Sequence, residues 1–246
     1  MLPREHGAYA QLALPLCAAL GASRPSLASV CLVVAACAAF VAHEPALVLL
    51  GRRGARAGRE SAPVARRWLG CTVAVALSSA CAALVLSASS RLWVLLPTTL
   101  AACAIALLLL RRERTLPGEL AACGALTCAA VPTAIAGGLG WHDALGLWAV
   151  FWAAFSLSTV EVRSIAGHPA TRVRRLAVWG AALAALATVG VMRPLLAAAA
   201  APVVVLVLVA VAVPFSGKRL RGLGWGLVAA SLVMTVGVVV ALRVGP

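Results

Sequence analysis

Two glutamates occupy matching places in a chain that has few acidic residues. Glu44 lies near the end of one apolar stretch, in "FVAHEPALVL", and Glu161 lies near the end of another, in "STVEVRS". A carboxylate at the edge of a membrane-buried segment is costly unless it has a partner or a wet cavity. Paired carboxylates can also act as acid and base, or bind a metal ion. We therefore take Glu44 and Glu161 as candidate catalytic residues.

Two histidines accompany these carboxylates. His6 and His43 are candidate catalytic residues, either as additional metal ligands or as proton carriers. A metal ion, if one binds, would be held by Glu44 and Glu161. No HxxxH or HExxH spacing places two ligands on one helix face, so the sequence leaves the metal and its identity open.

Three arginines are candidate substrate- or anion-binding residues. Arg52 and Arg53 follow the first glutamate, and Arg163 follows the second by two residues. A planar guanidinium group fits the geometry of phosphate, so a diphosphate is the anion that this set would suit. Arg163 is the best of these anion-binding candidates, because it lies at a helix end. Arg114 is not a candidate, because membrane topology alone explains the basic loop in which it lies.

The composition places these residues in a membrane protein. Of 246 residues, 63% are hydrophobic and 11% are charged, whereas soluble domains have about 25% charged residues. The net charge of +14 does not indicate nucleic acid, because one Tyr and four Phe offer few rings for stacking bases. We expect a membrane lipid or isoprenoid as partner and no nucleic acid, with anionic headgroups at the basic loops.

The pattern of apolar segments predicts an all-α integral membrane protein with about nine transmembrane helices. Each segment is close to the ~20 residues that cross the hydrocarbon core as a helix. The segments lie at about 8–22, 26–44, 68–88, 91–110, 118–139, 143–162, 176–192, 194–215 and 223–242. Residues 1–246 then form a single polytopic domain.

A weak internal repeat relates helices two and three to helices six and seven. In both units a helix has a polar end, a basic connection follows, and an arginine pair opens the next helix. The arginine pairs are Arg66–Arg67 and Arg174–Arg175. Such repeats are common in membrane proteins with internal symmetry.

The basic residues predict the orientation. Seventeen of the 21 arginines and lysines fall in the even-numbered connections or before the first helix, and four fall on the other side. Cytoplasmic loops carry the excess of basic residues, so the N-terminus is expected in the cytoplasm and the C-terminus outside.

Three stretches resemble the YwiC-like family of bacterial membrane proteins. They are "PREHGAYAQLALP" at 3–15, "HEPALVLLGRRGAR" at 43–56 and "STVEVRS" at 158–164. The resemblance implies a multi-pass protein of the bacterial cytoplasmic (inner) membrane. It implies no defined activity.

The topology is also similar to that of the UbiA superfamily of intramembrane prenyltransferases. That resemblance implies a nine-helix bundle whose acidic motifs, at the cytoplasmic ends of helices two and six, bind Mg²⁺ and an isoprenoid diphosphate. Glu44 and Glu161 fall near these places. The aspartate-rich motifs NDxxDxxxD and DxxxD are absent, and two lone glutamates offer too few oxygen ligands for two Mg²⁺ ions. The cofactor and the substrate stay open.

Three functions are consistent with the sequence. The first is a UbiA-like protein with a cytoplasm-facing polar pocket for an isoprenoid or lipid, including a divergent prenyltransferase. The second is a non-catalytic assembly factor or lipid-binding protein. The third is a small-molecule permease, which the scarcity of ionisable residues inside the apolar segments disfavours.

Overall fold

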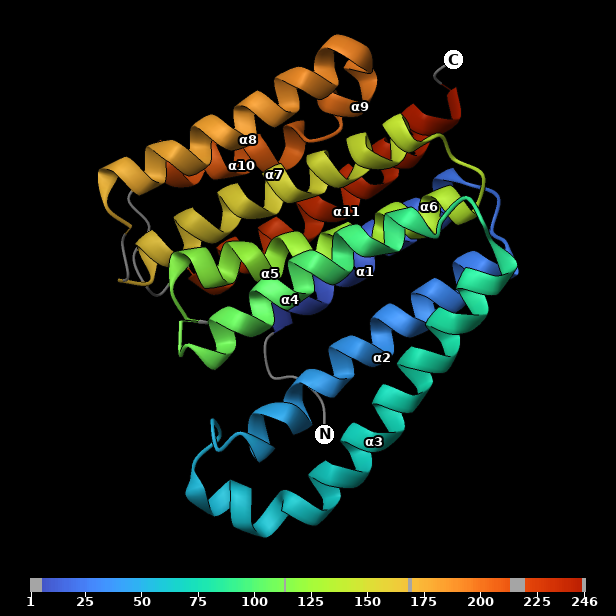
Figure 1. The fold of residues 1–246 in the computed structure, drawn as a ribbon. Helices are drawn as coiled ribbons and strands as arrows, with labels where there is room; N and C mark the ends of the chain where they lie inside the picture. The colour runs from blue at the N-terminus through green and yellow to red at the C-terminus, as the bar shows by residue number, and fades with distance from the viewer. Residues whose placement is uncertain (1–5, 113, 168–169, 213–219, 245–246) are drawn as a thin grey trace.

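The computed structural model describes residues 6–112, 114–167, 170–212 and 220–244, and these residues contain helices and turns but no strand (Figure 1). The helices, in chain order, are α1 (His6–Ala22), α2 (Leu27–Leu49), α3 (Ala55–Leu86), η1 (Leu92–Val94), α4 (Leu95–Leu109), α5 (Leu116–Cys128), α6 (Ala130–Ala136), α7 (Trp141–Ile165), α8 (Arg172–Met192), α9 (Pro194–Ala198), α10 (Ala201–Ala212) and α11 (Leu220–Val244).

The predicted all-α, membrane-type fold is confirmed. Eight helical segments in the described residues are long and apolar enough to cross a membrane, and a shorter apolar helix spans Gly7–Ala22. Each of the nine predicted segments corresponds to one helix or to two consecutive short helices. The protein is therefore a multi-pass, membrane-type helical bundle.

Prolines explain why three predicted segments are divided. Proline has no backbone N–H to donate to the carbonyl four residues earlier, and its ring crowds that carbonyl. In an unbroken helix the backbone N–H at position 132 would donate to the carbonyl of Cys128, where α5 ends. The backbone N–H at position 202 would likewise donate to the carbonyl of Ala198, where α9 ends. Pro97 similarly follows the junction of η1 and α4. Each of these prolines therefore lies just after a junction between two helices.

The second and third helices are longer than the sequence predicts. Helix α2 continues through Pro45 to Leu49, and α3 already begins at Ala55. A single proline removes one hydrogen bond, and the apolar residues that follow it extend the helix by a full turn. Arg66 and Arg67 consequently lie inside α3 and do not open it.

The core of the bundle lies around α7. Leu147, Val150, Phe151, Ala154 and Leu157 of this helix are buried. They pack among residues of α1, α5, α6, α10 and α11. By contrast, α3, α4 and α8 bury few residues, as expected for helices that face lipid.

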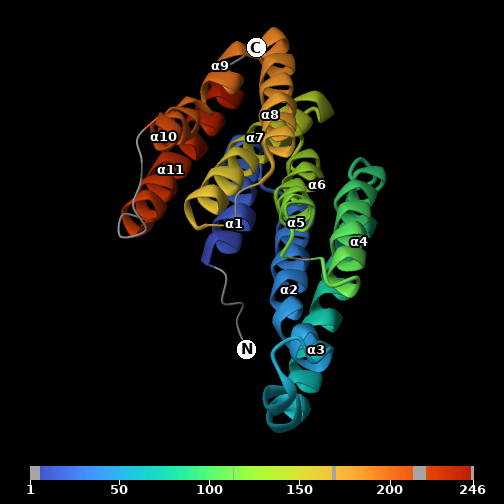
Figure 2. The same cartoon turned by 90° about the vertical axis from the view of Figure 1, so that its left-hand side faces the viewer.

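Helices α2 and α3 form a hairpin at one side of this bundle, and α4 packs beside α5 (Figures 1 and 2). The start of α2 is fixed to the end of α6, since Ser26 Oγ donates to the carbonyl of Ala136 at 2.8 Å. The backbone N–H of Arg24 also donates to the carbonyl of Gly137 at 2.9 Å. These two hydrogen bonds to backbone carbonyls therefore hold this end of the hairpin to the end of α6.

Candidate functional site

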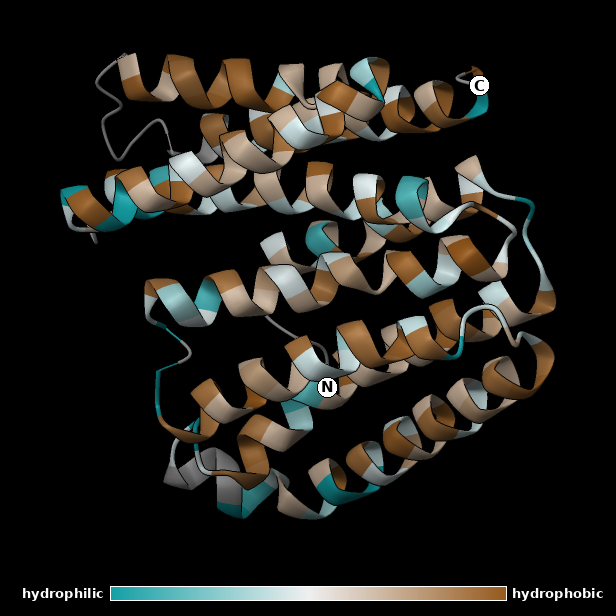
Figure 3. Cartoon of the chain, turned by 45° about the horizontal axis from the view of Figure 1, so that its top comes forward, coloured by the Kyte–Doolittle hydropathy of each residue, from teal (hydrophilic) through white to brown (hydrophobic). Residues whose placement is uncertain are grey.

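The arginine-rich end of the bundle is the end where α2, α4 and α7 finish and α5 and α8 begin. Polar residues gather mainly at helix ends and in connections, and the middles of the helices are hydrophobic (Figure 3). The candidate residues other than His6 lie at this end, on α2, on α7 and in the turn after α2. The side chain of His6 lies outside the described residues.

Glu44 is a buried carboxylate that is fully engaged by one arginine. It lies on α2 with 6% of its surface exposed. Arg53 returns from the turn after α2 and donates from Nε to Oε1 at 2.9 Å and from Nη2 to Oε2 at 2.5 Å. A bidentate pair of this kind is strong and orients both groups. The neighbouring His43 is partly exposed.

Glu161 lies in a similar arrangement on α7. It is 4% exposed, and Arg175 from the first turn of α8 donates to both its oxygens, at 2.8 and 2.6 Å. Trp179 Nε1 adds a third hydrogen bond to Oε1 at 2.9 Å. This network joins the end of α7 to the start of α8. In both helix pairs of the proposed repeat, a buried glutamate thus forms an ion pair with an arginine that follows it in the chain. The repeat itself stays a prediction.

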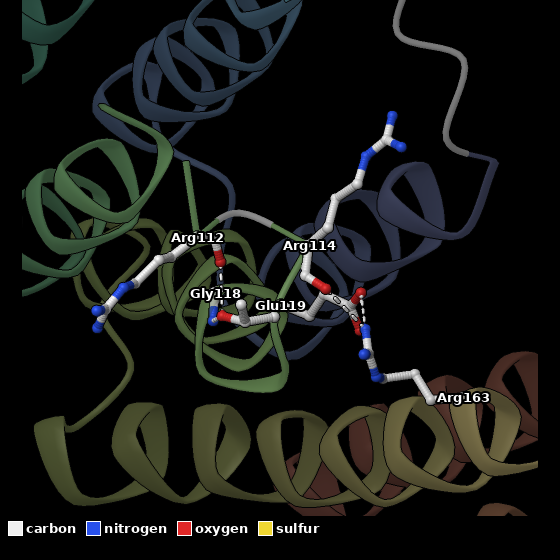
Figure 4. A network of polar contacts seen from close by, with 6 residues as sticks. Arg112, Arg114, Gly118, Glu119 and Arg163 are labelled. Carbon is white, nitrogen blue, oxygen red and sulfur yellow. Dashed lines mark hydrogen bonds and ion pairs between the residues drawn. The ribbon is translucent and has the colours of Figure 1, made fainter. Parts of the chain in front are cut away.

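Arg163 also has a carboxylate partner. Its Nη1 forms an ion pair with Glu119 in the first turn of α5 and donates to the backbone carbonyl of Arg114 at 3.1 Å (Figure 4). Its Nε is buried and has no hydrogen-bond acceptor in the described residues. The candidate that the sequence ranks first for anion binding therefore joins α7 to α5.

Thr115 fixes the loop that carries Arg112 and Arg114. Its hydroxyl donates to the carbonyl of Arg112 at 2.6 Å and accepts from the N–H of Gly118, which caps α5. Figure 4 shows the guanidinium groups of Arg112 and Arg114 pointing away from each other and from Glu119. The loop therefore presents two arginine side chains outward.

Arg52 connects the ends of α2 and α4. Its Nη2 donates to the carbonyls of Leu108 and Leu109, at 2.9 and 3.2 Å. The last carbonyls of a helix lack intrahelical partners and carry partial negative charge, so a guanidinium group is favoured there. Arg52 thereby holds the hairpin against the bundle at the arginine-rich end.

A hollow of about 420 Å³ lies between these two helix ends. Its lining residues are Leu50, Gly51, Arg52, Arg111 and Arg114. Three of these five described residues are arginines, so an anion would be favoured there. We call it the arginine hollow.

In the described residues no hydrogen bond or ion pair joins Glu44 to Glu161. Each carboxylate is bound by its own arginine, although α2 and α7 both pack on α6. Within the described residues no group of three or more His, Cys, Asp or Glu side chains is placed to hold a metal ion. Shared function of the two glutamates in one cavity stays a prediction.

The sequence did not predict several of the interactions at this end. Arg175, Trp179 and Glu119 were not expected as partners of candidate residues, and Arg114 was assigned to topology alone. The arginine pair at 174–175 gave a signal for Arg175, since it opens a helix after a glutamate-bearing helix. Nothing in the residue types singles out Glu119 as the partner of a side chain 44 positions away.

At the opposite end the polar residues are also paired. Asp143 lies in the first turn of α7, and both its oxygens accept from Arg193 at 2.8 and 3.0 Å. Arg243 Nε donates to the carbonyl of Gly21 at 2.7 Å. These contacts hold the helix ends in place. No acidic cluster occurs among the described residues at this end.

Comparison with protein families assigns more than half of the chain. The family model described as YwiC-like protein matches residues 2–135, which include Glu44, Glu119 and the whole arginine hollow. Glu161 and Arg163 lie beyond the match. No curated protein and no solved structure matches the chain.

Proposed function

Because the chain belongs to the YwiC-like protein family and forms a bundle of membrane-length helices, we propose that it binds an anionic lipid or isoprenoid at its arginine-rich end. In this proposal the bundle is UbiA-like, the arginine-rich end faces the cytoplasm, and the membrane is the bacterial inner membrane. The observation that carries the proposal is that arginine side chains outnumber carboxylates among the described residues at that end.

The surplus follows from the pairings. Glu44, Glu119 and Glu161 form ion pairs with Arg53, Arg163 and Arg175 respectively. Three further arginines, Arg111, Arg112 and Arg114, are exposed, and their guanidinium groups form no ion pair with a described residue. Unneutralised guanidinium groups at a membrane surface attract anionic headgroups, by about 1 kcal/mol for each basic residue.

The same pairings favour binding without catalysis. A transferase that used Glu44 or Glu161 as metal ligand, acid or base would need a free carboxylate. Both oxygens of each glutamate accept hydrogen bonds from arginine. Opening either pair would leave a charge in a mostly buried position, which is costly. A lipid-binding role requires no such rearrangement.

The proposal is tested by lipid binding to the purified, full-length protein in phosphatidylcholine nanodiscs. Phosphatidic acid and farnesyl phosphate should bind more tightly than added zwitterionic lipid, as measured by native mass spectrometry. The preference should weaken as salt is raised, because exposed charges are screened. Equal retention of anionic and zwitterionic lipids at low salt would contradict the proposal.

A further inference from the structure

We propose that the arginine hollow is a binding site for the phosphate or diphosphate headgroup of a membrane amphiphile, an inference that rests on the proposed function and assigns it a site. Arg111 and Arg114 contact the headgroup, and Arg52 positions the two helix ends that form the hollow. This site is distinct from Glu44 and Glu161, where the sequence analysis places the chemistry.

The two helix ends that form the hollow have the same backbone geometry. At the end of α2 the N–H of Gly51 donates to Val48 and the N–H of Arg52 donates to Leu47. At the end of α4 the corresponding donors are Arg111 and Arg112, and their acceptors are Leu108 and Leu107. Both ends are Schellman motifs, in which the residue after the cap adopts a left-handed conformation.

Arg111 is exceptional at this position. Gly51, its counterpart on α2, has a φ of 70°, and Arg111 has a φ of 59°. Among the described residues Arg111 is the one non-glycine residue with positive φ. The left-handed conformation is unfavourable for a side chain and costs glycine nothing. The side chain of Arg111 is exposed, so packing does not account for it.

The position of Arg111 suits a charged ligand. Arg111 lines the hollow together with Arg52 and Arg114, so three arginines border one concavity. Glu119, a nearby described carboxylate, is held by Arg163, and Figure 4 shows the Arg114 guanidinium pointing away from that pair. Guanidinium groups bind phosphate oxygens through paired hydrogen bonds, which favours a phosphate ester over a carboxylate of lower charge.

Apolar side chains beside the hollow indicate that the ligand is an amphiphile. Leu50 lines the hollow with 48% of its surface exposed, and Leu109 and Leu110 at the end of α4 are 57% and 67% exposed. Exposed leucines next to arginines are typical of the boundary between headgroups and hydrocarbon. The headgroup would lie in the hollow and the chain would run along these leucines into the membrane.

The test uses the full-length protein in phosphatidylcholine nanodiscs, titrated with phosphatidic acid and monitored by native mass spectrometry. The double variant Arg111→Gly/Arg114→Ala should weaken phosphatidic acid binding by about tenfold or more, as expected when two charged contacts are lost. The matched control is Arg66→Ala/Arg67→Ala, which removes two exposed arginines from α3 that do not line the hollow and should weaken binding clearly less than the hollow variant does.

A second readout separates ligand contact from a structural role. Arg111→Gly alone should keep or raise the melting temperature, because glycine relieves the strained backbone, and should still weaken binding. A lower melting temperature together with unchanged binding would overturn the assignment of Arg111.

The remaining outcomes distinguish the site from the function. Equal binding losses in the double variant and its control would overturn the hollow as the site, while the preference for anionic lipid would stand. No preference of the wild-type protein for phosphatidic acid over phosphatidylcholine would overturn the proposed function itself. If inorganic pyrophosphate binds as tightly as phosphatidic acid, the ligand is a soluble anion and the assignment of an amphiphile is wrong.

Discussion

Arg53 folds back from the turn after α2 and holds both carboxylate oxygens of Glu44, a residue of the same helix. The glutamate is 8% exposed at its side chain and the arginine 22%. The pair spans the last turn of α2 and therefore fixes the direction in which the chain leaves this helix. It leaves Arg52, the residue before Arg53, directed towards the end of α4.

Arg53→Ala should lower the free energy of unfolding by about 1–3 kcal/mol, because it leaves a buried carboxylate without its charged partner. Thermal and denaturant unfolding in detergent would measure the loss. Arg67→Ala, an exposed change on α3, is the control and should have little effect. The double variant Glu44→Gln/Arg53→Ala should recover part of the loss, and a loss equal to the sum of the single changes would contradict the coupling.

Glu161 accepts hydrogen bonds from two residues of α8, so its removal should have a larger effect than removal of the Trp179 donor alone. Trp179→Phe deletes one neutral hydrogen bond and should cost about 0.5–1.5 kcal/mol. Glu161→Gln leaves Arg175 without a charged partner and should cost more than Trp179→Phe. Unfolding midpoints in detergent give the order, and the reverse order would show that the tryptophan, not the ion pair, joins α7 to α8.

The sequence was sufficient for the helices and insufficient for the ion pairs. Apolar runs of membrane length are a local signal, and each predicted run became helix. The partners of Glu44 and Glu161 are 9 and 14 residues away, across turns whose geometry depends on how helices pack. Arg163 looked like an anion ligand because it follows Glu161, yet its partner Glu119 lies on another helix. The backbone strain at Arg111 has no signature in residue type, because most strained positions of this kind are glycine.

Gly137 should be intolerant of a side chain. A Cβ atom there would lie 2.2 Å from Ser23 Oγ and 3.1 Å from the carbonyl oxygen of Arg24, at the contact that fixes the start of the α2–α3 hairpin. Gly137→Ala should therefore cost about 1–3 kcal/mol through overpacking. Gly140→Ala is the matched control, since nothing lies within 4 Å of a Cβ atom at that position. Equal melting temperatures for the two variants would show that the contact yields without cost.

The last prediction concerns orientation. The arginines of the ends of α2, α4 and α7 and of the start of α8 lie at one end of the bundle, whereas Arg24, Arg193 and Arg243 contact residues of the opposite end. Basic residues are retained in the cytoplasm during insertion, so the arginine-rich end should be cytoplasmic.

Reporters at three positions test this orientation. A green fluorescent protein inserted after Gly54 should fluoresce, because it remains in the cytoplasm. Alkaline phosphatase inserted after Gly138, or fused after Pro246, should be active, because it folds outside. Gly54 is preferred to positions further along because α3 begins at Ala55. Each reporter exchanged for the other should give the opposite signal, which controls for expression. Phosphatase activity at Gly54 would reverse the orientation and would move the arginine hollow to the outer leaflet, where the anionic lipids of the inner leaflet could not reach it.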